Sequence, residues 1–266
     1  MLESITPLIL TYNEAPNLER TLQQLQWARR IVVIDSFSTD ATLDILKRYP
    51  QVEVTQRKFD THAKQWNSGL EQIQSEWVLS LDADYVLTNA LIDELKTLFP
   101  APEIDGYFIP FKYCVFGKPL RGTILPPRQA LFRKGRSHYI DDGHTQLLVV
   151  KGQSESLSNP IYHDDRKSLS RWLWAQDRYM VLEVKKLQET PLSELGWGDK
   201  VRKQKILAPF IIFAYCLIIK GGIFDGWRGW YYALQRMFAE TLLSLRLMEA
   251  NLRENSRTNQ PSQNPD

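Results

Sequence analysis

Short apolar runs alternate with amphipathic segments along the N-terminal part of the chain. The apolar runs are rich in β-branched residues and only a few residues long, and this predicts buried strands. The segments between them place leucine and isoleucine at helical spacing, and Pro16 stands where a first helical turn tolerates it. The predicted strands are Ile5–Thr11, 31–34, Val52–Thr55 and Trp77–Leu81, and the predicted helices are 17–28, Asp40–Tyr49, 62–74 and Thr88–Phe99. This order predicts an α/β fold with a mostly parallel sheet flanked by helices.

The pattern changes after the last of these helices. Between 105 and 163, short apolar runs are separated by Pro and Gly, which is typical of an antiparallel sheet that completes the same domain. These runs are 107–111, 129–133, 146–150 and 160–163. We therefore expect residues 1–165 to form one catalytic domain.

From about 167 onward the spacing of the apolar residues is helical. A first helix is predicted at 167–188, and an amphipathic helix is predicted from Trp227 to Met248. The polar residues that follow show no periodicity, which is typical of a disordered tail. The expected division is therefore a domain at 1–165, a helical region at 166–250 and a tail at 251–266.

The stretch 206–219 carries no charged residue and follows a basic run at 199–205. As a helix it would reach about 21 Å at ~1.5 Å per residue, which is short of the ~30 Å hydrocarbon core of a bilayer. Because Trp and basic residues cluster beside it, we expect it to lie in the membrane interface or to re-enter the membrane. Packing of these helices on each other or on a partner subunit is the alternative.

Composition narrows the functional classes. Lys and Arg number 33 against 31 Asp and Glu, and the resulting net charge of +2 argues against a general binder of nucleic acid. The two cysteines, Cys114 and Cys216, are too few for a disulfide framework and fit a reducing compartment. No basic segment precedes the first apolar run, so we expect no signal peptide. The expected location is cytoplasmic, peripheral on the inner face of the membrane.

Polar residues cluster directly after three of the predicted strands. The clusters are Tyr12-Asn13-Glu14, Asp35-Ser36 and Asp82-Ala83-Asp84. In open parallel sheets, ligands bind in the crevice beyond the carboxyl ends of the strands. We therefore expect the three clusters to face one ligand.

The two acids of the third cluster can act on one point. Asp82 and Asp84 point the same way if the chain is extended, because side chains two residues apart share a face. Mg²⁺ and Mn²⁺ prefer oxygen ligands, and they commonly bind through one or two carboxylates together with the phosphates of a substrate. The pair suits a cation that neutralises a diphosphate leaving group. A solvated turn is the alternative interpretation.

Three motifs in fixed order strengthen the interpretation that Asp82 and Asp84 hold a cation. TYNEAPNL follows the first strand, VIDSFSTDAT spans the end of the second, and SLDAD ends the fourth. Together, over roughly residues 4–165, they resemble glycosyltransferase family 2, whose members are inverting nucleotide-sugar enzymes with the A-type fold. RQALFRKG, DDGHT and IYHDD, further downstream, are similar to the subgroup near bacterial lipopolysaccharide-core and cell-envelope glycosyltransferases.

The resemblance implies roles for the polar clusters. The residues expected to border the nucleotide base and ribose are Thr11, Tyr12, Asn13 and Glu14. Asp35 should accept a hydrogen bond from the base, although Ser36 stands where the family usually has a second acid. Asp82 should face the ribose or the metal, and Asp84 should bind the metal.

Two further polar residues belong to a stretch that approaches the donor in the family, and two arginines lie near the expected site. Lys64 and Asn67 lie where the chain often nears the nucleotide, and their alternative interpretation is a polar helix face. Arg128 and Arg133 flank a predicted strand near the expected site. They suit diphosphate oxygens, because the guanidinium fork matches phosphate geometry.

An inverting transfer needs a carboxylate that removes the proton of the acceptor hydroxyl. The family places this base between the antiparallel strands, where this chain has Asp141 and Asp142 before Gly143 and His144. Adjacent side chains of an extended segment point opposite ways, so one of the two acids faces the site, and Asp142 is favoured. A turn signal is the alternative. Many A-type enzymes carry a C-terminal His that joins the metal sphere, so the resemblance implies His163 as the third metal ligand, and a purely structural histidine is the alternative. Its nitrogen suits Mn²⁺ better than Mg²⁺.

The sequence thus predicts a metal-dependent inverting glycosyltransferase. Its expected partners are a nucleotide-diphosphate sugar, a divalent cation (Mn²⁺ or Mg²⁺), and an envelope glycolipid or polyprenyl-linked acceptor met at a membrane surface. A sugar-phosphate nucleotidyltransferase is one alternative, but such an enzyme carries Gly and basic residues where this chain has TYNEAPN. A non-catalytic, membrane-docked scaffold with a nucleotide site is the other.

Overall fold

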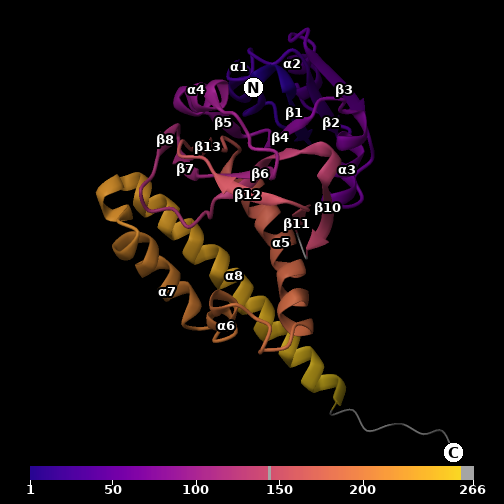
Figure 1. Ribbon diagram of the computed structural model, residues 1–266. Coiled ribbons are helices and arrows are strands. Elements are labelled where there is room, and N and C mark those ends of the chain that lie inside the picture. Colours follow the sequence, from indigo (N-terminus) through magenta and orange to yellow (C-terminus); the bar gives the residue numbers. More distant parts are fainter. Residues whose placement is uncertain (143–144, 259–266) are drawn as a thin grey trace, which may run out of the picture. The chain divides into compact units, whose positions relative to one another are not determined.

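The computed structural model describes residues 1–142 and 145–258 (Figure 1). Gly143 and His144, which follow the expected base, lie outside the described residues, as does the end of the expected tail from 259 onward. The chain divides into two compact units, Met1–Lys167 and the residues from Ser168 onward. Each unit is described by itself.

A seven-stranded sheet forms the centre of the N-terminal unit, in the order β12-β6-β9-β4-β1-β2-β3. The first strands of the chain run parallel to one another within it. They are β1 (Ile5–Thr11), β2 (Ile31–Asp35), β3 (Val52–Gln56) and β4 (Trp77–Asp82). The predicted α/β fold with a mostly parallel sheet is therefore confirmed.

The region expected to be antiparallel is mixed. β9 (Arg128–Arg133) runs antiparallel between β4 and β6 (Ile104–Ile109). β10 (Ser137–Asp142) and β11 (Thr145–Val150) form a separate antiparallel hairpin. The expectation is wrong for β12 (Gln153–Ser156), which pairs in parallel with β6.

A smaller sheet beside the central one is mixed as well. Its strands are β5 (Tyr85–Leu87), β13 (Ile161–His163), β7 (Phe111–Val115) and β8 (Lys118–Pro119), in that order. β13 pairs antiparallel with β5 and parallel with β7. Strands joined by a tight turn must pair antiparallel, whereas β12 and β13 return to their sheets after long excursions and can run in either direction.

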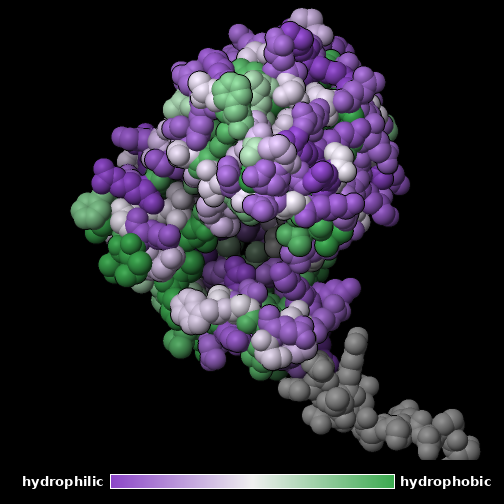
Figure 2. All heavy atoms as spheres, in the orientation of Figure 1, coloured by the Kyte–Doolittle hydropathy of each residue, from purple (hydrophilic) through white to green (hydrophobic). Residues whose placement is uncertain are grey.

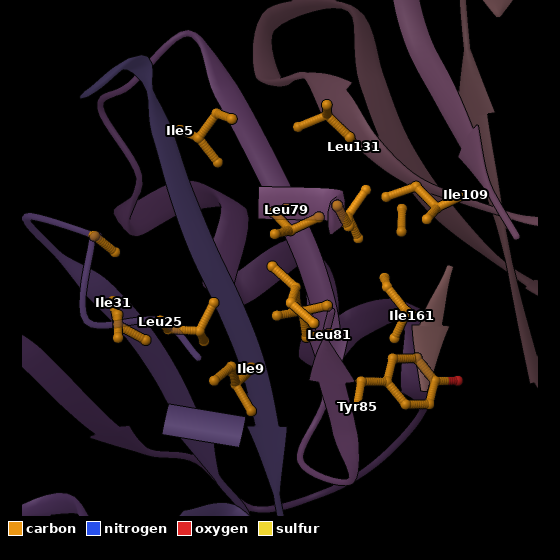
Figure 3. Close-up of a cluster of buried hydrophobic side chains, with 14 of the residues drawn as sticks. Ile5, Ile9, Leu25, Ile31, Leu79, Leu81, Tyr85, Ile109, Leu131 and Ile161 are labelled. Carbon is orange, nitrogen blue, oxygen red and sulfur yellow. The ribbon is translucent and has the colours of Figure 1, made fainter. Parts of the chain in front are cut away.

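Helices pack on both faces of the central sheet. They are α1 (Leu18–Gln23), α2 (Thr42–Leu46), α3 (His62–Gln72) and α4 (Asn89–Thr97), with 3₁₀ turns at Leu2–Ser4 and Lys134–Arg136. Successive residues of β1 point to opposite faces, so Ile9 joins Leu25 in one buried cluster (Figure 3) while Leu8 joins Trp66 in another. Because both faces of the strand are buried, apolar residues follow one another at positions 8–10 and do not alternate with polar ones.

The C-terminal unit is helical, as predicted. Its elements are α5 (Leu169–Glu189), α6 (Trp197–Arg202), α7 (Ala208–Ala214), a π-helical turn η3 (Tyr215–Ile219), a 3₁₀ turn η4 (Gly222–Asp225) and α8 (Trp227–Thr258). Apolar residues of α5 and α8 form its core, among them Leu187 and Leu243. The charge-free stretch 206–219 contains the short helix α7 and the π-helical turn η3 that follows it.

One boundary of this unit differs from the prediction. The tail expected from 251 onward is helical as far as Thr258, because α8 continues through it. Extending an existing helix adds a backbone hydrogen bond for each residue ordered, so polar residues can prolong it. Glu249 and Arg253, one turn apart, form an ion pair on its surface.

Within residues 1–142 and 145–258, none of the helices is both long enough and apolar enough to cross a lipid bilayer.

Candidate active site

The parallel strands bring three of the predicted residues to one edge of the sheet. Thr11 is in register with Asp35 on the neighbouring strand β2, and Leu10 is in register with Asp82 on β4. β1 lies between β2 and β4, so the carboxyl ends of all three strands meet there. The loops after these strands carry the remaining members of the polar clusters.

Asp35, the last residue of β2, is buried at this edge of the sheet. Its side chain is completely buried, and its carboxylate accepts hydrogen bonds from Thr11 Oγ1 (2.9 Å), Ser38 Oγ (2.5 Å) and Gln56 Nε2 (3.2 Å). Ser36, in place of a second acid, accepts a hydrogen bond from Gln65 Nε2 (2.9 Å) of α3. The expected contact between Asp35 and a nucleotide base remains a prediction, and protein donors already hold both Asp35 oxygens.

Asn13 links the loop after β1 to the loop after β2 through hydrogen bonds. Its backbone is left-handed, with a φ of 56°, which Asn tolerates better than most residues. Its amide N–H donates to Ser38 Oγ (2.9 Å), and its side-chain oxygen accepts from the backbone of Thr39 (2.8 Å). Tyr12, beside it, is exposed on this loop. Asn13 thus fixes the conformation that presents Tyr12, and the expected contacts of both residues with a nucleotide remain predictions.

Asp84 and His163 form a buried acid–imidazole pair. Their Oδ2 and Nε2 atoms lie 3.1 Å apart, although 79 positions separate them in the sequence. β13 and β5 cause this approach, because His163 is in register with Tyr85, the residue after Asp84. The other Asp84 oxygen and the other His163 nitrogen are buried without a hydrogen-bond partner among the described residues. Unpaired buried polar atoms cost free energy, so a ligand that bound these two atoms would lower that cost.

Electrostatics favours the charged forms of this pair. Burial alone would raise the pKa of the Asp84 carboxyl, but His163 and Lys167 outweigh it and hold this pKa below its usual range. Burial disfavours a charged imidazole, yet Asp84 holds the pKa of His163 above its usual value. The carboxylate is therefore ionised and has one oxygen left for a cation.

Asp82 has a different partner from Asp84. Arg128 of β9 donates from Nη1 to Asp82 Oδ2 (3.0 Å) and to the Tyr85 hydroxyl (2.5 Å). Within the described part of the chain, no group of three His, Cys, Asp or Glu residues is arranged to hold a metal ion. The expected three-residue set is thus not assembled. Asp84 still fits a divalent cation, and so does His163 once its imidazole has given up its proton, because such ions commonly complete their coordination with substrate phosphates and water.

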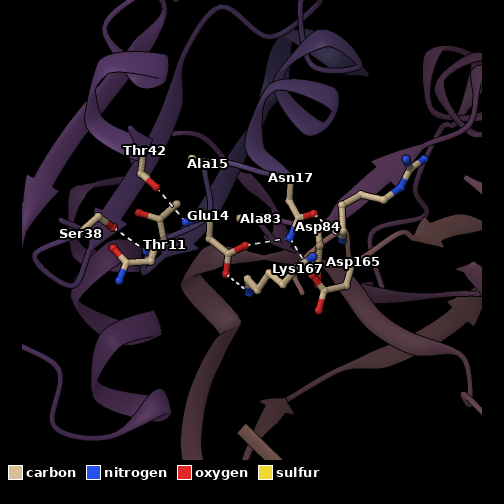
Figure 4. Close-up of polar contacts among 12 residues, drawn as sticks. Thr11, Glu14, Ala15, Asn17, Ser38, Thr42, Ala83, Asp84, Asp165 and Lys167 are labelled. Atoms are coloured by element: carbon tan, nitrogen blue, oxygen red, sulfur yellow. Dashed lines mark hydrogen bonds and ion pairs between the residues drawn. The ribbon is translucent and has the colours of Figure 1, made fainter. Parts of the chain in front are cut away.

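The structure adds Lys167 to the site, which the sequence did not indicate. Its ammonium donates to Glu14 Oε1 (2.5 Å), and Glu14 Oε2 accepts from Asn17 Nδ2 (3.1 Å), as Figure 4 shows. Asn17 also donates to Asp165 Oδ1 (2.9 Å). Burial raises the pKa of Glu14, Lys167 opposes this, and Asp84 raises it further. Lys167 and Glu14 stand 153 positions apart, so no spacing in the sequence relates them.

A network of buried polar groups holds the segment from His163 to Lys167. Asp164 is buried and accepts from Gly117 N (2.9 Å) and, with both oxygens, from Arg166 Nε (2.9 and 3.0 Å). Arg20 of α1 donates to the backbone oxygen of Asp164 (2.7 Å). These bonds fix the chain between the metal-ligand candidate His163 and Lys167.

Removing the Lys167 ammonium is expected to destabilise the fold. Lys167→Met leaves the Glu14 carboxylate in a poorly solvated position without its cation. We expect the free energy of unfolding to fall by about 2 kcal/mol, below the ~3–5 kcal/mol of a fully buried pair because both side chains keep some exposure. Urea unfolding measures this, and adding Glu14→Gln should recover most of the loss. A change within about 0.5 kcal/mol would mean that the pair contributes nothing.

The candidate bases lie on the β10–β11 hairpin, beside α3. Asp141 Oδ1 accepts a hydrogen bond from Ala63 N (3.3 Å) in the first turn of α3. Asp141 and Asp142 are paired with Gln146 and Thr145 in the hairpin, so their side chains point to opposite faces. The Asp141 carboxylate thus binds the first turn of α3. Asp142 is the other candidate base, and its carboxylate points away from that helix.

The other two residues expected near the nucleotide also lie on α3. The Asn67 side chain donates to Tyr139 O and accepts from Tyr139 N, both at 2.9 Å, so it binds the β10 backbone. Lys64 is 64% exposed, with its ammonium 3.5 Å from Asp60. Lys64 therefore behaves as the polar helix-face residue of the alternative interpretation, and its contact with a nucleotide remains a prediction.

Arg133 was wrongly placed near the diphosphate. It is in register with Trp77, at the start of β4, whereas Arg128 lies at the end where β4 finishes. Arg133 forms ion pairs with Glu76 and Asp105, and its guanidinium lies 4.6 Å from the Trp77 ring centroid. Arg128 and Arg133 are the first and last residues of β9, so they lie at opposite edges of the sheet.

The chain is similar to known proteins in sequence and in fold. The family model described as glycosyl transferase family 2 matches residues 8–145. The lipopolysaccharide core biosynthesis glycosyltransferase LpsC of Rhizobium meliloti (strain 1021) is 27% identical over 233 residues, which are 84% of this chain and 83% of that protein. An uncharacterized glycosyltransferase of Rickettsia bellii (strain RML369-C) is 29% identical over 106 residues, and the chain spans only 36% of its length.

Among solved structures, the mannosyltransferase PcManGT from Pyrobaculum calidifontis, in complex with GDP-Man and Mn²⁺, is similar with a TM-score of 0.55. The two are 14% identical, and the likeness covers 92% of this chain and 87% of that one, so it shows the fold alone. The family model, in contrast, matches more than half of the chain and includes all three strand-end motifs. This chain therefore belongs to glycosyltransferase family 2.

Proposed function

We propose that this protein transfers a sugar from a nucleotide-diphosphate donor to an acceptor hydroxyl, with inversion and with the help of a divalent cation. The observation that carries the proposal is the Asp84–His163 pair, in which the second carboxylate oxygen is buried and has no hydrogen-bond partner among the described residues. It lies beside the strand-end residues Thr11, Asp35 and Asp82, where open parallel sheets bind their ligands.

Asp84 and His163 would hold the cation, which supplies positive charge to the diphosphate as the sugar leaves. Arg128, paired with Asp82 in the free protein, presents a guanidinium that can turn to a phosphate oxygen while it keeps one hydrogen bond to the acid. Lys167 adds a second positive charge next to Glu14. These residues bind and orient the leaving group.

Asp142 would act as the general base. Its carboxylate takes the proton from the acceptor hydroxyl while the oxygen of that hydroxyl forms a bond to the anomeric carbon. The bond between that carbon and the diphosphate oxygen breaks on the opposite face, and the nucleoside diphosphate leaves with the bonding electrons. One carboxylate on the acceptor side is sufficient, because no covalent sugar–enzyme intermediate forms.

We propose a glycolipid or polyprenyl-linked saccharide of the cell envelope as the acceptor. The relative LpsC, which covers most of this chain, carries a name that refers to lipopolysaccharide core biosynthesis. Such an acceptor is presented at a membrane, and the C-terminal unit exposes many large apolar side chains. The protein would therefore work as a peripheral protein at the inner face of the cytoplasmic membrane.

Removal of divalent metal tests the reaction class. With a panel of uridine and guanosine diphosphate sugars, we expect release of nucleoside diphosphate in the presence of Mn²⁺ or Mg²⁺. Chelation should lower this rate by about a hundredfold or more, and added Mn²⁺ should restore it. The result that rejects metal dependence is an equal rate with and without chelator, and release of inorganic diphosphate from a nucleoside triphosphate would indicate a nucleotidyltransferase instead.

A further inference from the structure

An apolar surface surrounds the turn between α7 and α8 in the C-terminal unit. Six of its large side chains are at least half exposed, and Phe224, Ile219 and Ile218 reach 75%, 72% and 69%. We call this set the apolar turn, and its members are Phe210, Ile218, Ile219, Ile223, Phe224 and Trp227. Figure 2 shows hydrophobic side chains gathered over α7 and the turn that follows it. Contiguous apolar surface of this kind marks a site of interaction.

The backbone beneath the apolar turn is tightly built. Gly221 and Gly226 have φ values of 72° and 60°, in the region that favours glycine. A Cβ on Gly229 would lie 1.8 Å from the Gly222 oxygen, so α8 and the turn touch through their backbones. Leu217 and Cys216 are buried below. The exposed side chains therefore project from a well-packed turn and do not belong to a loosely packed loop.

Positive charge and aromatic rings border the apolar turn. The guanidinium of Arg228 lies 4.7 Å from the Trp227 ring centroid, and the Lys220 ammonium lies 5.6 Å from that of Tyr215. Aromatic rings and basic side chains around an apolar patch match the interface of an anionic bilayer, where rings lie among the headgroups and cations meet lipid phosphates.

We propose that the apolar turn inserts into the surface of an anionic lipid bilayer and holds the protein there. The short α7 suits this role, since shallow insertion needs an apolar edge and not a spanning length. A second copy of the chain fits this surface less well. In a two-fold contact, the positive charges of Lys220 and Arg228 on one copy would lie near the same charges on the other. The inference rests on the proposed function for its purpose, since a lipid-linked acceptor is reached from the membrane.

Vesicle flotation of the purified full chain, without donor or acceptor, tests the insertion. We expect the protein to float with vesicles of phosphatidylcholine and phosphatidylglycerol, and to float less with phosphatidylcholine alone or at high salt. Ile218→Glu combined with Ile219→Glu should lower the bound fraction by about tenfold or more, because two apolar side chains lose their lipid contacts. Leu192→Glu, at a residue that is 61% exposed in the loop after α5, is the matched control and should float as the wild type.

Three results would overturn the proposal. The first is flotation of the double variant equal to that of the wild type, and the second is no flotation of the wild type. The third is a wild type that sediments as a dimer and a double variant that sediments as a monomer, since this would assign the surface to a second copy. Circular dichroism and binding of nucleoside diphosphate with Mn²⁺ should be unchanged in the double variant. If the wild type floats but no nucleotide binds, the insertion stands and the proposed function fails.

Discussion

Replacing Asp84 by Asn is expected to reduce sugar transfer by about a thousandfold or more while the fold is retained. The exchange keeps the shape of the side chain and removes the charge that would hold the cation against the leaving diphosphate. Loss of a metal's stabilisation of developing charge is worth several kcal/mol, and each ~1.4 kcal/mol is a factor of about ten in rate. Initial rates with saturating Mn²⁺ measure the effect.

Binding measurements separate this explanation from a damaged fold. Asp84→Asn should abolish the part of nucleoside-diphosphate binding that depends on Mn²⁺, as seen by calorimetric titration, and its thermal unfolding should stay cooperative. Asp93→Asn is the matched control, because Asp93 is 69% exposed on α4 and pairs only with Lys96 there among the contacts described. If Asp84→Asn transfers sugar within about tenfold of the wild type, Asp84 does not hold a catalytic cation.

Asp142→Asn is expected to lower kcat by about a hundredfold or more, since general-base catalysis contributes ~10²–10⁴ in rate. The KM for the donor should change little, because the base acts on the acceptor hydroxyl. Metal-dependent binding of nucleoside diphosphate should also be kept. Transfer kinetics with donor and acceptor varied separately measure the difference.

Asp141 provides the internal control for that experiment. Its carboxylate accepts a hydrogen bond from the first turn of α3, so Asp141→Ala removes a helix-capping acceptor. We expect a loss of about 1 kcal/mol in the free energy of unfolding and a kcat near that of the wild type. The reverse pattern, with kcat lost in Asp141→Asn and kept in Asp142→Asn, would exchange the roles of the two acids.

The strands of the parallel sheet were predictable because the hydrophobic effect acts on them from both sides. All residues of β2 are buried, so its composition alone separates it from the neighbouring loops. Helix ends were less predictable. α1 ends at Gln23, five residues before the predicted end, because Leu25 and Ala28 are buried from turns and not from a helix. An apolar spacing therefore indicates which residues are buried better than it indicates their backbone.

The pairing of the later strands could not be predicted. β12 and β13 have short, unremarkable sequences, and β12 is fully exposed. Their parallel partners, β6 and β7, lie many residues upstream, and only the complete sheets select them. His163 owes its place beside Asp84 to the antiparallel pairing of β13 with β5. The local motif therefore indicated His163 as a candidate ligand, and the tertiary structure decided that Asp84 is its neighbour.

The sequence by itself determined the parallel sheet, the polar residues at the strand ends and the apolar segment before α8, because each depends on residues close together in the chain. Only the tertiary structure decided which charges meet. It paired Asp82 with Arg128, buried one oxygen of Asp84 without a hydrogen-bond partner in the described part of the chain, and brought Lys167 to Glu14. Ion pairs depend on the distance between side chains in the folded state, and for residues so far apart in the sequence the fold alone sets that distance.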